Sequence, residues 1–179
     1  MSWRRVGMIY TVLTLLAALV IVVDHTRVPT AEGPEQAPVG PSMLEADAAA
    51  IRAVTFRKEG KVVRAVREDQ RWRTVEPAGA QVSPDLIAAT IATLTSGQAA
   101  EKLAQEPEHD LAAYGLDIPS ATVDVVIGDA LAKPVTVEIG ARNPTRTAVY
   151  ARRSDQPSIF LVGMNLSYYI DLIFEAAKT

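Results

Sequence analysis

Two histidines are the first side chains to consider for metal or acid–base chemistry, and only one of them stands among several acidic residues. His109 stands within five residues of Glu106, Glu108 and Asp110, whereas His25 does not. Imidazole and carboxylate groups together are a donor set that a divalent ion accepts. Closely spaced acids are also typical of a solvated turn, and we favour that interpretation. We therefore predict no metal ion and no cofactor.

Nucleophilic and phosphate-binding motifs are missing from the sequence. No serine stands in a recognisable elbow with a histidine as its base. Gly128 and Gly140 are isolated glycines of the kind found in turns, with no phosphate-binding loop around them. No spacing marks a pair of carboxylates for acid–base catalysis. We predict no catalytic residues and a protein that is not an enzyme.

Arginines gather around a short polar segment that begins at Asn143. If this loop folds back on its strand, four guanidinium groups lie near one edge, where they suit an anionic polymer, lipid head groups or an acidic protein surface. The alternative is a solvated hairpin whose charges protect a sheet edge. The candidate binding patch comprises Arg142, Asn143, Arg146, Arg152 and Arg153.

A second distinctive stretch, YGLDIP at 114–119, is better explained by structure than by binding. Gly115 permits a positive φ after a helical turn, and Pro119 fixes the entry to the next strand. Tyr114 and Leu116 are expected to pack under the loop. We predict a structural loop whose members include Asp117, with a binding loop as the alternative.

The charge balance limits the classes of partner. The chain has 179 residues, with 18 basic and 21 acidic side chains and no cysteine. Arg4, Arg5 and Asp24 precede residue 27, so 16 basic and 20 acidic residues lie from residue 27 onwards. This excess of acid does not favour a nucleic-acid partner. The missing cysteines exclude disulfides and thiolate metal sites.

The N-terminal residues 6–24 predict a transmembrane anchor. Val6 to Val23 carries no charged side chain, and 18 helical residues span roughly 27 Å, close to the apolar thickness of a bilayer. Arg4 and Arg5 favour residues 1–5 on the cytoplasmic side. A cleaved signal peptide is an alternative, but no small-residue cleavage site follows. A buried core helix is another, but the segment is apolar all round.

Residues 25–41 predict an extended linker, because four prolines and two glycines oppose a helix or a packed core. Residues 42–179 then form a single domain. We expect a single-pass protein of a bacterial inner (plasma) membrane, with this domain in the periplasm or outside.

The sequence of the domain predicts seven longer strands and two helices. In its first half we expect a helical turn from a capping box at Ser42 and Glu45, then strands over 51–58, 61–67 and 71–75 and a helix from Ser83 to Ser96. In its second half we expect a short strand within 98–103, a helical turn at 110–114, strands over 122–127, 135–139, 147–152 and 158–162, and a helix capped by Asn165.

Short turns between these strands require antiparallel neighbours. The expected fold class is therefore α+β, a mainly antiparallel sheet with two covering helices, preceded by one transmembrane helix.

Several of these segments together resemble a known family. They are the anchor, Arg71-Trp72-Arg73 leading to Pro77, Tyr114-Gly115-Leu116-Asp117 with Pro119, Val137 to Gly140, Val149 to Arg152, and Ile159 to Val162. Over residues 47–176 the chain resembles domain of unknown function 4340. The resemblance implies a bacterial envelope protein without a catalytic motif. Some relatives are similar to auxiliary components of gliding-type ABC transport systems, and many carry the unit more than once.

These observations leave three hypotheses for function. The first is a non-enzymatic, membrane-anchored binding or scaffolding domain with an envelope protein as partner, as an accessory of a transport complex. The second is a binding domain for an anionic envelope ligand through the arginine-rich hairpin. The third and weakest is an envelope hydrolase.

Overall fold

Two-residue turns fold the first three strands back on one another. The structure is a computed structural model that describes residues 42–96, 100–103, 110–129 and 132–178, all within one compact unit, Ala37–Thr179. Glu59 and Gly60 have φ angles of 51° and 73°, as a type I′ hairpin turn requires. Asp69 and Gln70, at 47° and 66°, form a second turn of the same kind.

The elements follow the predicted order closely. They are η1 (Ala48–Ala50), β1 (Ile51–Lys58), β2 (Lys61–Glu68), β3 (Arg71–Glu76), α2 (Pro84–Thr95), β4 (Ala100–Lys102), η2 (Leu111–Tyr114), β5 (Ala121–Ile127), β6 (Val135–Arg142), β7 (Ala148–Arg153), β8 (Ile159–Gly163) and α3 (Asn165–Ala176). The strand β6 extends three residues beyond its predicted end, through an irregularity in register between Ile139 and Arg142.

All eight of these strands belong to one antiparallel sheet, in the order β3-β2-β1-β5-β6-β7-β8-β4. The two halves of the sheet meet where β1 pairs with β5. The short strand β4 lies at the far edge, beside β8. The predicted α+β class with a mainly antiparallel sheet is therefore confirmed.

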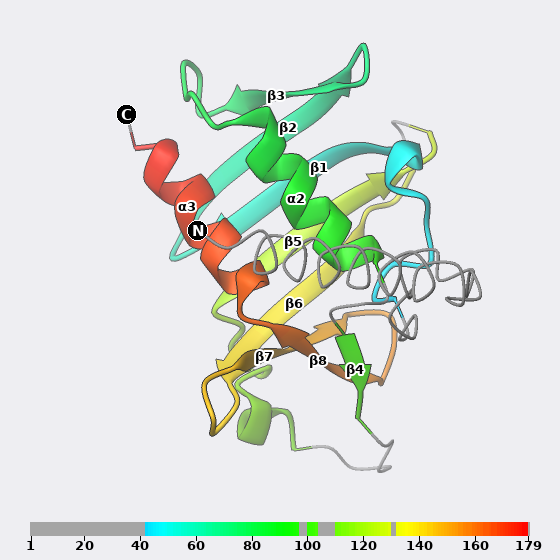
Figure 1. The fold of residues 1–179 in the computed structure, drawn as a ribbon, viewed down its shortest axis with the longest axis vertical. Coiled ribbons are helices and arrows are strands. Elements are labelled where there is room, and N and C mark those ends of the chain that lie inside the picture. Colours follow the sequence, from blue (N-terminus) through cyan, green and yellow to red (C-terminus); the bar gives the residue numbers. More distant parts are fainter. Residues whose placement is uncertain (1–41, 97–99, 104–109, 130–131, 179) are drawn as a thin grey trace, which may run out of the picture. The chain divides into compact units, whose positions relative to one another are not determined.

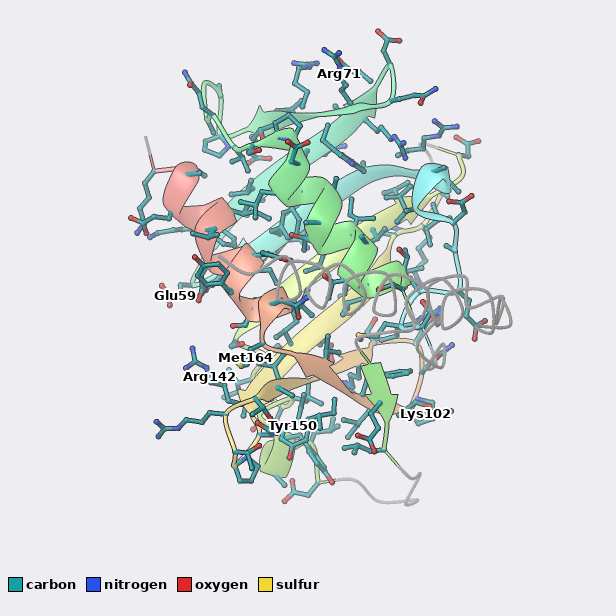
Figure 2. The ribbon with its side chains drawn as sticks, viewed as in Figure 1. Glu59, Arg71, Lys102, Arg142, Tyr150 and Met164 are labelled. Carbon is teal, nitrogen blue, oxygen red and sulfur yellow. The ribbon has the colours of Figure 1, made fainter. Side chains whose placement is uncertain are left out.

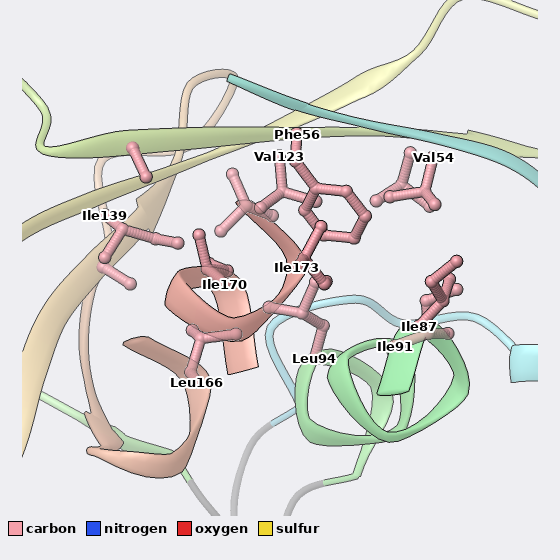
Figure 3. Packing of buried hydrophobic residues seen from close by; sticks show 14 of the residues in the cluster. Val54, Phe56, Ile87, Ile91, Leu94, Val123, Ile139, Leu166, Ile170 and Ile173 are labelled. Carbon is pink, nitrogen blue, oxygen red and sulfur yellow. The ribbon is translucent and has the colours of Figure 1, made fainter. Parts of the chain in front are cut away.

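The helices α2 and α3 contact each other and lie on the same face of the sheet (Figure 1). Phe56 of β1 and Val123 of β5 project from that face towards Leu94 and Ile173, one residue from each helix (Figure 3). Each of these four side chains is fully buried. The apolar stripe predicted for the last helix is the one that closes this core.

The opposite face of the sheet is polar where β1, β5, β6 and β7 run side by side. Thr55, Asp124 and Thr136 are neighbours in one row across three strands. The Thr136 hydroxyl donates to Asp124 at 2.7 Å, and Arg57 also pairs with Asp124. This alternation between an apolar and a polar face accounts for the period-two pattern of the strands.

The predicted capping box at Ser42 and Glu45 is wrong. Met43 and Leu44 are instead buried in the core, and the Leu44 N–H donates to the Leu94 carbonyl at 3.0 Å. The Ser42 hydroxyl donates near the same helix end, 2.8 Å from the Thr95 carbonyl oxygen. This segment therefore satisfies the terminal carbonyls of α2, which have no partner inside the helix.

The helix caps predicted at Ser83 and Asn165 also differ from those in the structure, as does the start of the first helical turn. Asp47, not Ser42, begins the first helical turn, and its carboxylate accepts from the Ala49 N–H at 2.8 Å. Ser83 precedes α2 as expected, but its side chain makes no capping hydrogen bond. Asn165 is the first residue of α3 and not its cap, because Met164 already has a helical backbone.

Among the residues that the structure describes, no helix is long and apolar enough to cross a membrane. The cytoplasmic residues 1–5, the anchor at 6–24 with its flanking Arg4 and Arg5, and the linker at 25–41 are predictions that lie outside the described residues.

Candidate binding site

The strand β2 has an open edge where β3 ends. Lys58 and Lys61 flank a two-residue turn and so form a hydrogen-bonded pair, which makes Arg57 and Val62 the next, non-hydrogen-bonded pair. The N–H and C=O of Val62 therefore point away from β1. On that side β3 reaches only Glu76, opposite Arg64. No described strand pairs with Val62 there.

The chain beyond β3 cannot complete this edge. Pro77 follows Glu76 directly, and proline has no N–H to donate. A turn then carries the chain away, with the Ala80 N–H donating back to the Pro77 carbonyl at 3.2 Å. One donor and one acceptor of β2 are thus presented at the surface.

A groove lies beside this edge, between β2 and the end of α3, and we call it the α3 groove. Its volume is about 340 Å³. It is lined by Lys61, Val62, Val63, Pro77, Phe174, Ala177 and Lys178. Five of these residues are apolar and two are lysines, so the groove has an apolar wall and a cationic rim. Its size suits a few side chains of a ligand or partner.

A smaller, charged notch of about 180 Å³ adjoins the groove and shares Lys61, Phe174 and Lys178 with it. Its charges alternate in sign. Lys58 pairs with Asp171, and the Lys178 ammonium donates to the Glu175 carboxylate at 2.7 Å. The described ion pairs leave Lys61 as the lysine of the groove without a direct carboxylate contact.

The ion pair between Lys178 and Glu175 shifts the pKa of both side chains. The hydrogen bond from Lys178, followed by its charge, lowers the pKa of Glu175, and Lys61 adds to that effect. In return the bond to Glu175 raises the pKa of Lys178, with a contribution from Glu59. Both groups therefore remain charged near neutral pH, and Lys178 stays paired with Glu175 at the rim of the α3 groove.

The arginine-rich hairpin proves to be two separate regions. Arg142 and Arg146 lie at the β6–β7 turn, and the Arg142 side chain projects away from the fold at the end of β6 (Figure 2). Both are exposed, and neither makes an ion pair within the described part of the chain. The Arg146 backbone is left-handed, with φ at 58°.

Asn143 organises that turn instead of facing a ligand. Its carboxamide oxygen accepts from the N–H groups of Thr147 and Ala148 at 2.9 and 3.1 Å. Its amide nitrogen donates to Thr145 at 2.8 Å. These contacts hold the turn in one shape, with the flanking arginines exposed.

Arg152 and Arg153 do not join this cluster, because adjacent residues of a strand point to opposite faces. Arg152 donates to Glu138 at 2.6 Å, and Arg153 donates to Asp155 at 2.7 and 3.0 Å. The strand β7 lies between β6 and β8 and is not a sheet edge. Four guanidinium groups therefore do not meet, and the hypothesis of an anionic site is left with Arg142 and Arg146.

The YGLDIP segment packs as a structural loop against β6. Gly115 follows η2 with φ at 63°, and Leu116 is buried. The ring of Tyr114 meets Tyr150 edge-on at 4.8 Å between centroids; Tyr150 is labelled beside this loop in Figure 2. Gly140 allows the close approach, since a Cβ there would lie 2.3 Å from the Tyr114 carbonyl oxygen. The role of Asp117 and Pro119 in binding stays untested.

Most of the acidic cluster predicted around His109 lies outside the described residues. Asp110 is the only one of that group within the described residues, and its carboxylate accepts from the Ala112 N–H at 3.1 Å at the start of η2. The described part of the chain holds no group of three histidine, aspartate or glutamate side chains placed to bind a metal.

Sequence reasoning missed the α3 groove. Pro77 does signal the end of β3, and the outward Val62 breaks the alternation of β2. Neither signal predicts that the C-terminal helix lies beside β2, because the groove joins residues of β2 and α3 that are more than 100 positions apart. Only the packing of α3 across the sheet creates the groove.

The fold and this surface define a class of protein: a small α+β domain with one antiparallel sheet, two helices on one face and a surface groove. The chain belongs to the family described as Domain of unknown function (DUF4340), which it matches over residues 72–176. No curated protein and no solved structure matches it. The family resemblance seen in the sequence is therefore confirmed, while the family's description leaves function open.

Proposed function

We propose that this chain is a non-enzymatic binding domain, anchored in a bacterial plasma membrane, that docks a partner protein of the cell envelope in the α3 groove. The observation that carries the proposal is the open edge of β2 beside an apolar groove with two lysines at its rim. Backbone groups and an apolar wall together suit a polypeptide better than a small polar metabolite.

The sequence supplies the setting. Residues 6–24, uncharged as far as Val23, anchor the chain, and the proline-containing linker 25–41 spaces the domain from the bilayer. In this setting the domain acts as an accessory subunit of an envelope transport complex, a role suggested by the similarity of some members of the resembled family to auxiliary transport components.

Crosslinking of the full-length protein in cells tests this proposal. After membrane extraction, mass spectrometry should identify one envelope protein in near-stoichiometric amount. A variant that lacks residues 1–26 serves as the control and should lose both the membrane fraction and the partner. Recovery of the full-length protein alone, or turnover of an envelope substrate by it, would contradict the proposal.

A second candidate function is binding of an anionic envelope ligand at Arg142 and Arg146. It is favoured by a rigid turn that presents two exposed arginines. Replacing both by alanine should abolish binding of full-length protein to vesicles of anionic lipid. The control replaces Arg71 and Lys133, which are also exposed and carry the same total charge. Equal binding by both variants would reject the arginine turn as the site.

A further inference from the structure

The shape of the α3 groove indicates which part of a partner it receives. We propose that the groove binds an extended peptide segment that pairs with β2 at Val62, places an apolar side chain against Phe174 and an acidic side chain between Lys61 and Lys178. This inference rests on the proposed function and names the chemical class of the partner's binding segment.

The unpaired backbone groups of β2 determine the conformation of the bound segment. Along β2, the backbone groups of Val62, Arg64 and Val66 point away from β1, because they alternate with the residues hydrogen-bonded to it. Arg64 and Val66 pair with β3, but Val62 lies beyond its last residue, Glu76. A peptide in extended conformation can supply the missing N–H and C=O at that position, as in strand addition.

The side chains fix the composition. Val63, Phe174 and Ala177 form an apolar wall, so an apolar residue of the peptide is removed from water there. Both charged residues that line the groove are lysines, Lys61 and Lys178. An acidic side chain is the complement of that rim, while a basic peptide meets charge repulsion.

The same features argue against a lipid occupant. A lipid tail uses the apolar wall but leaves the N–H and C=O of Val62 without partners, and buried backbone groups without hydrogen bonds are unfavourable. The groove is also short, since Pro77 and Lys178 both line it and mark the end of β3 and of α3. A peptide of a few residues fits these limits.

Selection from a random dodecapeptide library displayed on phage tests the inference on the immobilised full-length chain. Enriched peptides should combine apolar residues with an aspartate or glutamate one or two positions away. Synthetic copies should then bind measurably by fluorescence anisotropy. If no peptide is enriched on the parent over the variant Lys61→Glu with Lys178→Glu, the inference is overturned.

Two variants, each with a matched control, locate the bound peptide. Val62→Pro removes an N–H that β1 does not use, so the hairpin remains and affinity should fall about 2- to 10-fold, the effect of one hydrogen bond. Val62→Thr keeps the N–H and is its control. Lys61→Glu combined with Lys178→Glu should weaken binding roughly tenfold. The matched control, Arg142→Glu with Arg146→Glu, makes the same charge change elsewhere.

The outcomes separate this inference from the function on which it rests. Peptides that bind Val62→Pro and the lysine variant as tightly as the parent overturn the groove as a strand-pairing site. An envelope partner that is still captured in cells by these variants would keep the anchored binding domain of the proposed function but would contradict the α3 groove as its docking site. If thermal unfolding shows that Val62→Pro does not fold, the inference is tested by the variant Lys61→Glu with Lys178→Glu alone.

Discussion

At the scale of single residues, a glycine permits a close approach between a loop and the sheet. Gly140 lies under the YGLDIP loop, and a Cβ there would lie 2.3 Å from the Tyr114 carbonyl oxygen and 3.0 Å from Leu116 Cγ. Gly140→Ala should lower the free energy of unfolding by about 3 kcal/mol, because a backbone oxygen cannot rotate away. Chemical denaturation measures this change.

Gly128→Ala is the control for that substitution. Gly128 has φ at 77°, but no atom lies within 4 Å of the added Cβ. Its expected cost is about 1 kcal/mol, the strain of a left-handed backbone alone. Equal losses at the two positions would mean that the loop does not pack on β6 as described.

Asp155 gives a pH prediction at the same scale. The hydrogen bond from Arg153, followed by a smaller effect of its charge, holds the pKa of Asp155 below its ordinary value of 3.8. A lowered pKa stabilises the fold above the ordinary value, and this contribution is lost as the pH falls through the lowered one. Asp155→Asn should therefore reduce the melting temperature at pH 7 but not near pH 2.

The control for this pH effect is Asp117→Asn, which changes an exposed aspartate outside the described ion pairs. It should leave the melting temperature unchanged at both pH values. A difference between Asp155→Asn and the parent that persists at pH 2 would contradict an effect of the Arg153 ion pair.

At the scale of elements, α3 closes the core and also forms one wall of the α3 groove. Ile170 is 2% exposed in the middle of this helix. Ile170→Ala should lower the free energy of unfolding by about 2–5 kcal/mol, because it leaves a cavity between the helix and the sheet. Tyr168→Ala, at a site 59% exposed, should change it by no more than about 0.5 kcal/mol.

The same helix shows what the sequence can predict. The apolar spacing from Leu166 to Phe174 predicts α3, and period-two alternation predicts β5 to β8, because each pattern depends on residues that are close in the chain. The caps at Ser42 and Asn165 fail, since tertiary contacts decide them. Met43 and Leu44 are buried, and the Leu44 N–H donates to the Leu94 carbonyl at the C-terminal end of α2.

The pairing of segments that are far apart in the chain could not be predicted from the sequence, because tertiary contacts decide it too. The pairing of β1 with β5 and the position of β4 beside β8 join segments separated by a helix or more. The four arginines near the β6–β7 turn are close in the sequence, yet strand alternation and the partners Glu138 and Asp155 divide them. The α3 groove depends on such placement throughout.

At the scale of the whole molecule, the proposed function joins a predicted anchor and linker to a domain whose α3 groove is proposed to receive an extended peptide. The groove makes this account testable in cells at one position. Ala177 is half-buried in its wall, so a photoreactive side chain there should contact whatever the groove binds. Ser154, exposed in the β7–β8 turn, is a matched position outside the groove.

The most direct measurement is therefore photocrosslinking in living cells, with the photoreactive amino acid placed at Ala177 in one full-length variant and at Ser154 in another. The account predicts a discrete product of higher mass that contains an envelope protein, formed from position 177 and not from position 154. It also predicts that Lys61→Glu with Lys178→Glu removes that product. No product from position 177, or the same products from both positions, would contradict it.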